Sequence, residues 1–158
     1  MATELEDLRI LKTAEAIADA IWKEVAAWDE FAQDVVGKQL ARAIDSIGSN
    51  IAASYGRLND GEKLQFLYYA RGSLFETKYW LNRTLVRELM QAREVKEYAV
   101  RLSEVARQLN TFANSLKTQP KDKAQPETIH ESPSQYRVDD STSSNPLFSD
   151  TELNWLES

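Results

Sequence analysis

The sequence predicts an all-α protein: an antiparallel up-down-up-down four-helix bundle followed by a disordered C-terminal tail. In four long segments, apolar residues recur three and four positions apart, and no segment alternates with the period of two that a strand requires. Short connections between long amphipathic helices make neighbouring helices antiparallel. All four prolines lie after residue 119. We therefore expect the bundle at residues 1–118 and the tail at residues 119–158.

The first helix is expected to open at Thr3, whose hydroxyl can cap it while Glu6 completes a capping box. Its buried stripe comprises Ile10, Ala14, Ile17, Ile21, Val25 and Trp28. The second helix is expected over about residues 31–57. Its stripe comprises Leu40, Ile44, Ile47 and Ile51. Gly48 and Gly56 lower helix propensity within this segment, so we expect another helix or subunit to pack closely there.

The turn at residues 58–61 separates the second helix from the third, with Asn59 or Asp60 as the N-cap. The apolar stripe of the third helix comprises Leu67, Ala70, Leu74, Leu81 and Leu85. The fourth helix has the most regular pattern, with the alternating spacing of a bundle seam. Its stripe comprises Val95, Tyr98, Leu102, Val105, Leu109, Phe112 and Leu116.

The third helix carries more aromatic residues than one core-facing stripe can bury. They are Phe66, Tyr68, Tyr69, Phe75, Tyr79 and Trp80. We expect some of them to lie at an interface between subunits. The alternative is that the tyrosines and the tryptophan cover the edge of the core and keep their polar ends in water.

Composition argues against an enzyme, a metal site or a cofactor site. The chain has no cysteine and one histidine, His130 in the tail, so no Glu-x-x-His metal pair or catalytic constellation is present. The five glycines stand singly, which excludes a glycine-rich phosphate loop. No apolar stretch is long enough to cross a bilayer, and the acidic N-terminus lacks the features of a secretory signal. We expect a cytoplasmic protein without membrane contact.

Charge is distributed unevenly along the chain. Residues 1–118 contain 16 Lys and Arg against 17 Asp and Glu, whereas residues 119–158 contain 3 against 8. The bundle is therefore nearly neutral and the tail acidic. Basic residues on the second and third helices are candidates for binding nucleic acid; the alternative is a solvated helix face. The candidates are Arg42, Arg57, Lys63, Arg71 and Lys78.

The end of the tail has the pattern of a short helix at about residues 148–157. Ser149 and Glu152 match a capping box, and Phe148 with Leu153 match a hydrophobic staple. Because eight residues do not hold a helix alone, we expect the segment to fold on docking to an unidentified protein partner. The residues expected to bind that partner are Leu147, Phe148, Leu153, Trp155 and Leu156. The alternative is that the tail folds back on its own bundle or on the ring of subunits.

Two motifs, Ser46-Ile47-Gly48-Ser49-Asn50-Ile51-Ala52 and Gly72-Ser73-Leu74, resemble those of the bacterial four-helix bundle family encoded by intervening sequences of large-subunit ribosomal RNA genes. The resemblance spans roughly residues 10–116, although the family usually has Glu where this chain has Ala53. It implies a homopentamer without enzymatic activity. It also implies signature packing positions, which are Ile47, Gly48, Asn50, Ile51, Gly56, Phe66, Gly72 and Glu76.

Two functions follow from these observations. The first is a non-enzymatic, homo-oligomeric scaffold or adaptor that captures a protein partner, in part through its C-terminal peptide. The second is an RNA-associated accessory protein, because a similar fold serves as the accessory variability determinant of diversity-generating retroelements. That relative binds a reverse transcriptase and nucleic acid, but it is typically strongly basic, whereas residues 1–118 here are almost neutral.

Overall fold

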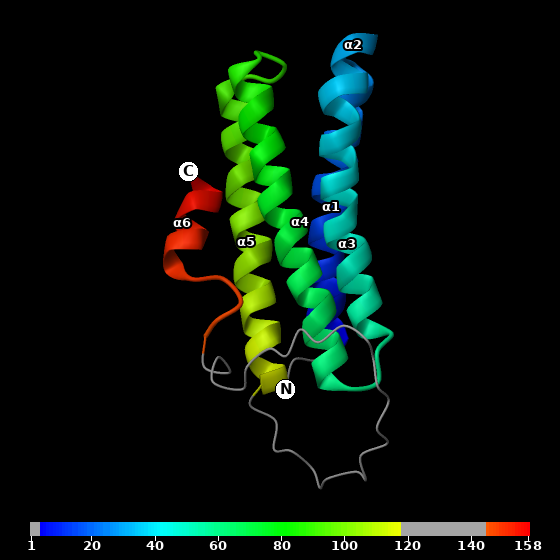
Figure 1. Cartoon of the computed structure of the whole chain (residues 1–158), viewed down its shortest axis with the longest axis vertical. Helices are drawn as coiled ribbons and strands as arrows, with labels where there is room; N and C mark the ends of the chain where they lie inside the picture. Colours follow the sequence, from blue (N-terminus) through cyan, green and yellow to red (C-terminus); the bar gives the residue numbers. More distant parts are fainter. Residues whose placement is uncertain (1–3, 118–144) are drawn as a thin grey trace, which may run out of the picture.

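Figure 1 shows a computed structural model of the chain, which describes residues 4–117 and 145–158. Within these residues the protein is all-helical and has no strand, as the sequence periodicity predicts. The elements are α1 (Glu4–Ala26), α2 (Glu30–Ala32), the π-helix η1 (Gln33–Gly37), α3 (Lys38–Tyr55), α4 (Asp60–Val86), α5 (Ala92–Lys117) and α6 (Asp150–Glu157). The predicted cap at Thr3 and most of the predicted tail lie outside the described residues.

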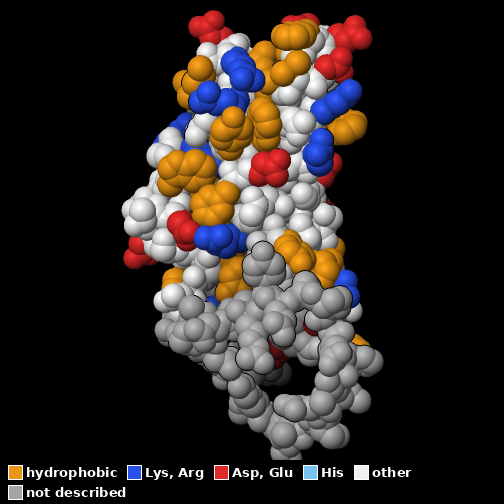
Figure 2. All heavy atoms as spheres, in the orientation of Figure 1, with side chains coloured by type: hydrophobic (Ala, Val, Ile, Leu, Met, Phe, Trp, Pro, Cys, Tyr) orange, Lys and Arg blue, Asp and Glu red, His pale blue; other side chains and the backbone are white. Residues whose placement is uncertain are grey.

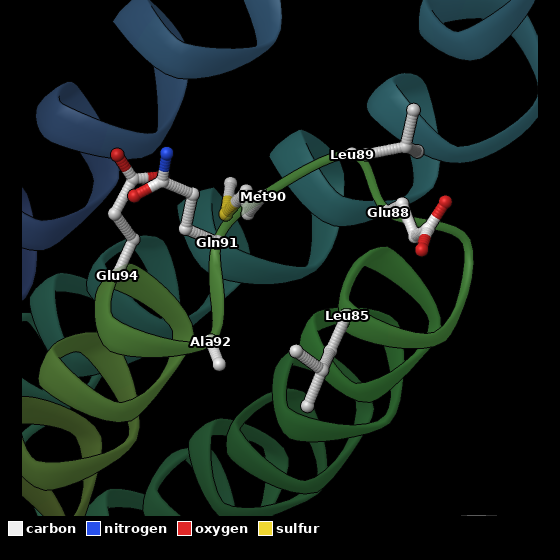
Figure 3. A pocket seen from close by; sticks show the side chains of 7 residues that line it. All are labelled: Leu85, Glu88, Leu89, Met90, Gln91, Ala92 and Glu94. Carbon is white, nitrogen blue, oxygen red and sulfur yellow. The ribbon is translucent and has the colours of Figure 1, made fainter.

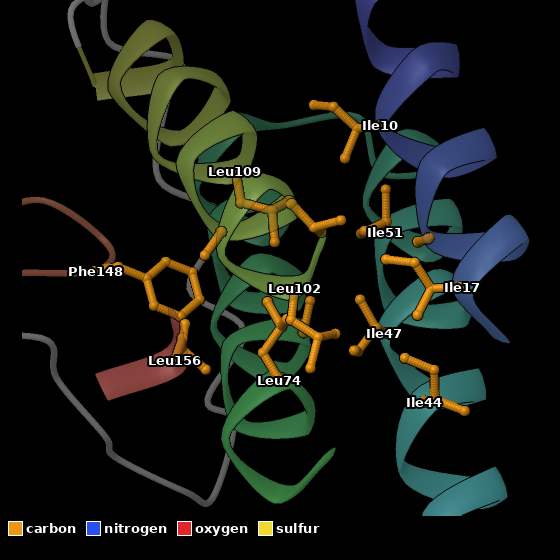
Figure 4. Packing of buried hydrophobic residues seen from close by; sticks show 14 of the residues in the cluster. Ile10, Ile17, Ile44, Ile47, Ile51, Leu74, Leu102, Leu109, Phe148 and Leu156 are labelled. Carbon is orange, nitrogen blue, oxygen red and sulfur yellow. The ribbon is translucent and has the colours of Figure 1, made fainter. Parts of the chain in front are cut away.

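The four long helices lie side by side along the length of the molecule (Figure 1). α3 packs against both α1 and α4, and α5 packs against both α4 and α1. Their apolar stripes meet in one continuous core, in which Figure 4 shows Ile17, Ile47 and Leu102 pointing toward one another. All seven residues of the predicted stripe on residues 95–116 are buried, so this expectation is confirmed.

The second predicted helix is interrupted near its start by the π-helix η1. The Asp29 carboxylate caps its first turn by accepting a hydrogen bond of 2.9 Å from the Ala32 N–H. The Gln33 side-chain amide donates to the Val25 and Ala26 carbonyl oxygens, each at 3.1 Å. It thereby gives hydrogen-bond donors to the last two carbonyl groups of α1, which have none within the helix. A Cβ atom on Gly37 would lie 2.7 Å from Val25 Cγ1. Glycine at this position therefore permits the close approach of the two helices, which the sequence analysis did not anticipate.

The third predicted helix begins as expected and ends differently. The Asn59 side chain accepts a hydrogen bond of 2.8 Å from the Glu62 N–H, which confirms Asn59 as the N-cap. The prediction that Leu85 belongs to the buried stripe is wrong, because its side chain is 39% exposed. Leu85 lies in the last turn of α4, just before Glu88 reverses the chain with a positive φ of 58°. The core has ended at this point, and the leucine faces the turn.

Buried hydroxyl groups find partners within their own helices. Ser54, Thr77 and Thr84 donate to backbone carbonyl oxygens three or four residues earlier, at 2.6–2.7 Å. Ser73 on α4 also lies 3.2 Å from Ser46 on α3, which joins the two signature motifs by a hydrogen bond. The hydroxyl groups of these residues are therefore paired although they are buried.

Candidate binding surfaces

The C-terminal segment lies against α5 and α4 of its own chain (Figure 1). The predicted capping box is confirmed: Ser149 Oγ accepts from the Glu152 N–H at 3.2 Å, and a Glu152 carboxylate oxygen accepts from the Ser149 N–H at 2.7 Å. The predicted short helix is therefore present as α6. In this structure it forms on its own bundle, which is the alternative that the sequence left open.

The apolar residues predicted to bind a partner are mostly buried here. Phe148 and Leu156 are fully buried and, in Figure 4, point toward the helices on which Leu74 and Leu102 lie. The Phe75 ring on α4 packs against both Phe148 and Trp155, with centroids 5.8 and 5.7 Å apart. Leu147 and Leu153 are also buried, whereas Trp155 remains 42% exposed. A partner therefore cannot reach most of this set while α6 is docked.

Two polar side chains hold the backbone of the segment. Asn110 on α5 donates to the Phe148 carbonyl oxygen at 2.9 Å and accepts from the Phe148 N–H at 2.6 Å. Arg71 on α4 donates from Nε to the Leu147 carbonyl oxygen at 2.9 Å and forms an ion pair with Glu152. The Arg71 guanidinium also lies 4.8 Å from the centre of the Phe75 ring. Pairing both backbone groups of one residue fixes the register of the segment on the bundle.

Basic side chains of α5 surround the remaining polar groups of the segment. Lys96 Nζ donates to the Glu157 carbonyl oxygen at 2.7 Å, and Arg107 pairs with the Glu157 carboxylate at 3.0 Å. Lys117 Nζ donates to the Asn145 carbonyl oxygen at 2.7 Å. We call the whole site the α6 groove. It is formed by Arg71 and Phe75 of α4 and by Lys96, Arg107, Asn110 and Lys117 of α5.

We expect docking of α6 to weaken in acid. Partial burial alone would raise the pKa of Glu152, but the Ser149 N–H and the Arg71 guanidinium outweigh it and lower that pKa. A carboxyl with a lowered pKa stabilises the docked state above its ordinary pKa, and this contribution disappears as the pH falls through the lowered value. Hydrogen-exchange protection factors of the α6 amides should fall over this range. In the variant Glu152→Gln these protection factors should be lower at neutral pH and should change less with pH. If their dependence on pH were the same as in the wild type, Glu152 would not be the group responsible.

The predicted signature positions divide into a buried set and an exposed set. Ile47 and Ile51 are buried in the core, and Asn50 donates to the Ser46 carbonyl oxygen of its own helix at 2.8 Å. Gly56, Gly72 and Glu76 are exposed, while Gly48 and Phe66 are half-buried. Among the described residues, the expected close packing at Gly48 and Gly56 is not found. A Cβ on Gly48 would meet only Leu11 Cδ1, at 3.8 Å, and one on Gly72 would meet nothing within 4 Å.

The five candidate nucleic-acid residues do not form one surface. Arg42 and Arg57 are exposed and Lys63 is half-buried. Arg42 lies near the start of α3, whereas Arg57 follows the end of α3 and Lys63 lies near the start of α4. Arg71 is engaged in the α6 groove, and Lys78 is only 2% exposed. Burial, with the nearby Lys96 charge, lowers the pKa of Lys78. Three of the five therefore remain available to a polyanion.

The outer face of α4 presents aromatic residues beside arginines. We call the set Tyr69, Gly72, Glu76 and Tyr79 the α4 outer stripe, because these residues are all exposed and follow one another at helical spacing. Phe66 packs on Tyr69 and Trp80 on Tyr79, with ring centroids 5.4 and 5.0 Å apart. Arg57 lies over Phe66 at 4.3 Å, and Arg83 lies beside Tyr79 at 5.8 Å. In Figure 2, exposed hydrophobic side chains are interspersed with charged ones on this view of the molecule.

A hollow of about 210 Å³ lies between α1 and α3. We call it the acidic hollow, since it is lined by the carboxylates of Glu15, Asp19 and Asp45 and by the small residues Gly48, Ser49 and Ala52, among others. Burial and the neighbouring Asp19 carboxylate raise the pKa of Asp45. None of the three carboxylates forms an ion pair with another described residue. A cation supplied from outside would relieve their repulsion.

A second hollow, of about 620 Å³, lies at the turn between α4 and α5, where Figure 3 shows Leu85, Met90 and Glu94 at its edge. It contains no nucleophile beside a base. In the part of the chain that the structure describes, no cluster of three or more His, Cys, Asp or Glu side chains could hold a metal ion. Nor is any described helix long and apolar enough to cross a membrane.

A family model described as 23S rRNA-intervening sequence protein matches residues 6–111, about two thirds of the chain. The chain belongs to this family. A comparison with curated proteins gave no match. The family match includes the signature residues, the α4 outer stripe and the acidic hollow, as well as most of α5. It ends before residues 145–158, so α6 is an addition to the part of this intervening-sequence protein that the family model matches.

Proposed function

We propose that this intervening-sequence protein is a non-enzymatic scaffold whose antiparallel up-down-up-down four-helix bundle assembles with copies of itself. The bundle topology is supported by the short connections at residues 27–29, 56–59 and 87–91, since each leaves little room except for a reversal of direction. The assembly is a closed ring in which one face of each copy meets a different face of the next. Five copies is the number that the family resemblance implies.

The observation that carries this proposal is the complementarity of two surfaces of one chain. The α4 outer stripe presents tyrosines flanked by Arg57 and Arg83, and the acidic hollow presents three unpaired carboxylates among small residues. Contact between two different faces is heterologous. Heterologous contacts close into a ring when the rotation from one copy to the next divides a full turn evenly. The same contact would give Asp45 a cation, which none of the described residues provides in an ion pair.

Two further features support an interface at these faces. The space around Gly72 is open, and Gly48 is in ordinary contact only, so packing against the described residues requires neither glycine. Arg83, which lies beside Tyr79, forms no ion pair with another described residue. A carboxylate of a neighbouring copy would pair with its guanidinium.

We expect Asp45→Arg to dissociate the assembly. The substitution places a cation in the acidic hollow, opposite the arginines of the α4 outer stripe, and like charges at an interface cost several kcal/mol, on the order of a hundredfold or more in affinity. Light scattering coupled to size-exclusion chromatography should give a multiple of the 18.0 kDa chain mass for the wild type and a smaller species for Asp45→Arg.

Glu104→Arg is the matched control, since it reverses an exposed charge on α5 that belongs to neither surface. It should leave the mass unchanged. A wild-type protein that is monomeric at tens of micromolar, or an Asp45→Arg protein with the wild-type mass, would overturn the proposal. Circular dichroism of each variant separates dissociation from unfolding.

The adaptor part of the proposal concerns the C-terminal segment. Most of its apolar residues are buried on their own chain, so capture of a protein partner by this segment requires α6 to leave its groove. Trp155 is the exception, because its half-exposed ring remains accessible at the surface. The bundle itself then provides the scaffold, and α6 is the part that can be offered to another protein.

The second candidate is an RNA-associated accessory protein that binds RNA or a reverse transcriptase. It is favoured by the exposed Arg57 and the half-buried Lys63, which lie on either side of the turn between α3 and α4, and by the exposed Arg42 near the other end of α3. If these residues contact phosphates, RNA affinity should fall steeply with salt, and each substitution Arg42→Glu or Arg57→Glu should lower the salt slope by about 1. Fluorescence anisotropy of a labelled RNA at graded salt measures this. Arg93→Glu, a substitution at an exposed position on α5, is the control. Equal effects of all three substitutions on RNA affinity and its salt dependence would argue against this function.

A further inference from the structure

The α6 groove has the properties of a peptide-binding site. It recognises backbone groups through Asn110, Arg71, Lys96 and Lys117, a buried aromatic ring through Phe75, and carboxylates through Arg71 and Arg107. Its ligand brings its own helix start, because the Ser149 and Glu152 capping box is complete within the segment. All these contacts depend on the peptide and the groove alone. None requires that both belong to the same chain.

The chain between the groove and its ligand is much longer than docking in one copy requires. Lys117 Nζ lies 2.7 Å from the Asn145 carbonyl oxygen, so the two ends of the connection are in contact. The connection nevertheless contains 27 residues, 118–144. At full extension 27 residues reach roughly 90 Å, more than twice the length of α5, a helix of about 39 Å. The segment is therefore long enough to reach the groove of an adjacent copy.

Charge complementarity also favours the C-terminal segment of another copy as the ligand of the groove. Arg71 and Arg107 of the groove pair with the Glu152 and Glu157 carboxylates, and Lys96 donates to the Glu157 carbonyl oxygen. The segment 145–158 contains no lysine or arginine. A second copy of this segment presents the identical aromatic, cap and carboxylates at identical spacing. In an assembly, the neighbouring segment is also held at a high effective concentration by its tether.

We propose that the α6 groove accepts residues 145–158 of a neighbouring copy, so that exchanged C-terminal segments link the subunits to one another. This inference rests on the proposed self-association, because the neighbouring groove must lie within reach. It assigns a ligand to the α6 groove, a surface that belongs neither to the α4 outer stripe nor to the acidic hollow. It also gives the acidic tail a role in the assembly that does not require a partner protein.

Because the chain has no cysteine, one engineered thiol in each copy tests the exchange directly. One full-length chain carries Arg107→Cys and a size tag, and the other carries Glu157→Cys; these exposed side chains form an ion pair in the docked state. The two are mixed, unfolded and refolded together, and treated with a short bis-maleimide. Each copy has a single thiol, so a product containing both chains can arise only between copies. We expect this mixed product.

Two matched variants identify the origin of the mixed product. Adding Phe148→Asp to the Glu157→Cys chain should abolish it, since a buried ring is replaced by a charge. Moving the groove thiol to Lys23→Cys, an exposed position on α1, should abolish it too. Circular dichroism and light scattering show whether each variant is folded and assembled. An assembled protein without the mixed product would overturn exchange alone, whereas a monomer without it would overturn exchange and self-association together.

Discussion

Leu102→Ala is expected to destabilise the folded chain by about 2–5 kcal/mol, because it leaves a cavity where the helices meet. Leu102 has no exposed surface and lies in the middle of α5, where Figure 4 shows it beside Leu74 of α4 and across from Ile47 of α3. Urea unfolding followed by circular dichroism, with wild type and variant at one protein concentration, measures the change in the free energy of unfolding. The loss is a large part of the stability of a typical domain.

Val100→Ala is the control on the same helix. Val100 is 42% exposed, so the same type of truncation should change stability by less than about 0.5 kcal/mol. Equal losses for the two variants would mean that α5 does not contact the other helices through the face described here.

Arg71→Ala is expected to release α6 from its groove. The substitution removes the hydrogen bond to Leu147, the ion pair with Glu152 and the stacking on Phe75. Together these contacts should contribute about 2–4 kcal/mol to docking, or roughly a 30- to 1000-fold change in the docking equilibrium. Hydrogen exchange of the α6 amides should approach the rate of an unstructured peptide, because eight residues do not keep a helix alone.

The bundle itself should survive this change, since Arg71 is only partly buried and lies outside the apolar core. Arg93→Ala provides the comparison, as Arg93 is paired only with Glu97 of its own helix at 3.4 Å. The reversed pair Arg71→Glu with Glu152→Arg should recover part of the protection lost in Arg71→Glu alone. Full protection of α6 in Arg71→Ala would mean that the apolar residues alone hold the segment.

The Leu102→Ala and Arg71→Ala variants test two different parts of the structure, the bundle and the C-terminal helix that docks on it. Leu102 tests the packing of the four long helices, which belongs to the part of the chain matched by the family model. Arg71 lies within that part as well, but its partners Leu147 and Glu152 lie beyond it. The arginine therefore has a role in this chain that depends on a segment outside the family match.

The helices themselves could be predicted because their signals are local. The stripe of residues 95–116 repeats at the spacing of a helix face, and the caps at Asn59 and Ser149 depend on hydrogen bonds within three residues. Leu85 was misassigned because the helical period says where a face lies along a helix, but not where the core beneath it ends. The π-helix at Gln33–Gly37 was not predicted from the sequence, and the close approach that accompanies it, of Val25 to Gly37, joins residues twelve positions apart.

The candidate surfaces were likewise predicted only where the signal is local in the sequence. The sequence indicated Phe148 as a functional candidate from its place in a hydrophobic staple, and Arg71 and Lys78 as nucleic-acid candidates from the concentration of basic residues on the second and third helices. Only the fold brings Arg71 to Glu152 and removes Lys78 from solvent, because both outcomes depend on which helix face is covered by α6 or by the core. Asn110 carried no sequence signal, since a single asparagine in a helix gives no indication that it will pair with the Phe148 backbone.

The sequence by itself therefore determined the helical class, most helix boundaries, the family and the capped C-terminal helix. The helical class, the boundaries and the capped helix follow from spacing and from hydrogen bonds between near neighbours in the chain, whereas the family follows from the match over residues 6–111. Tertiary structure alone decided where α6 docks, which basic residues remain exposed, and that an acidic hollow and an aromatic stripe lie on different faces of one bundle. Those properties depend on contacts between residues far apart in sequence, whose geometry is set by the packing of whole helices.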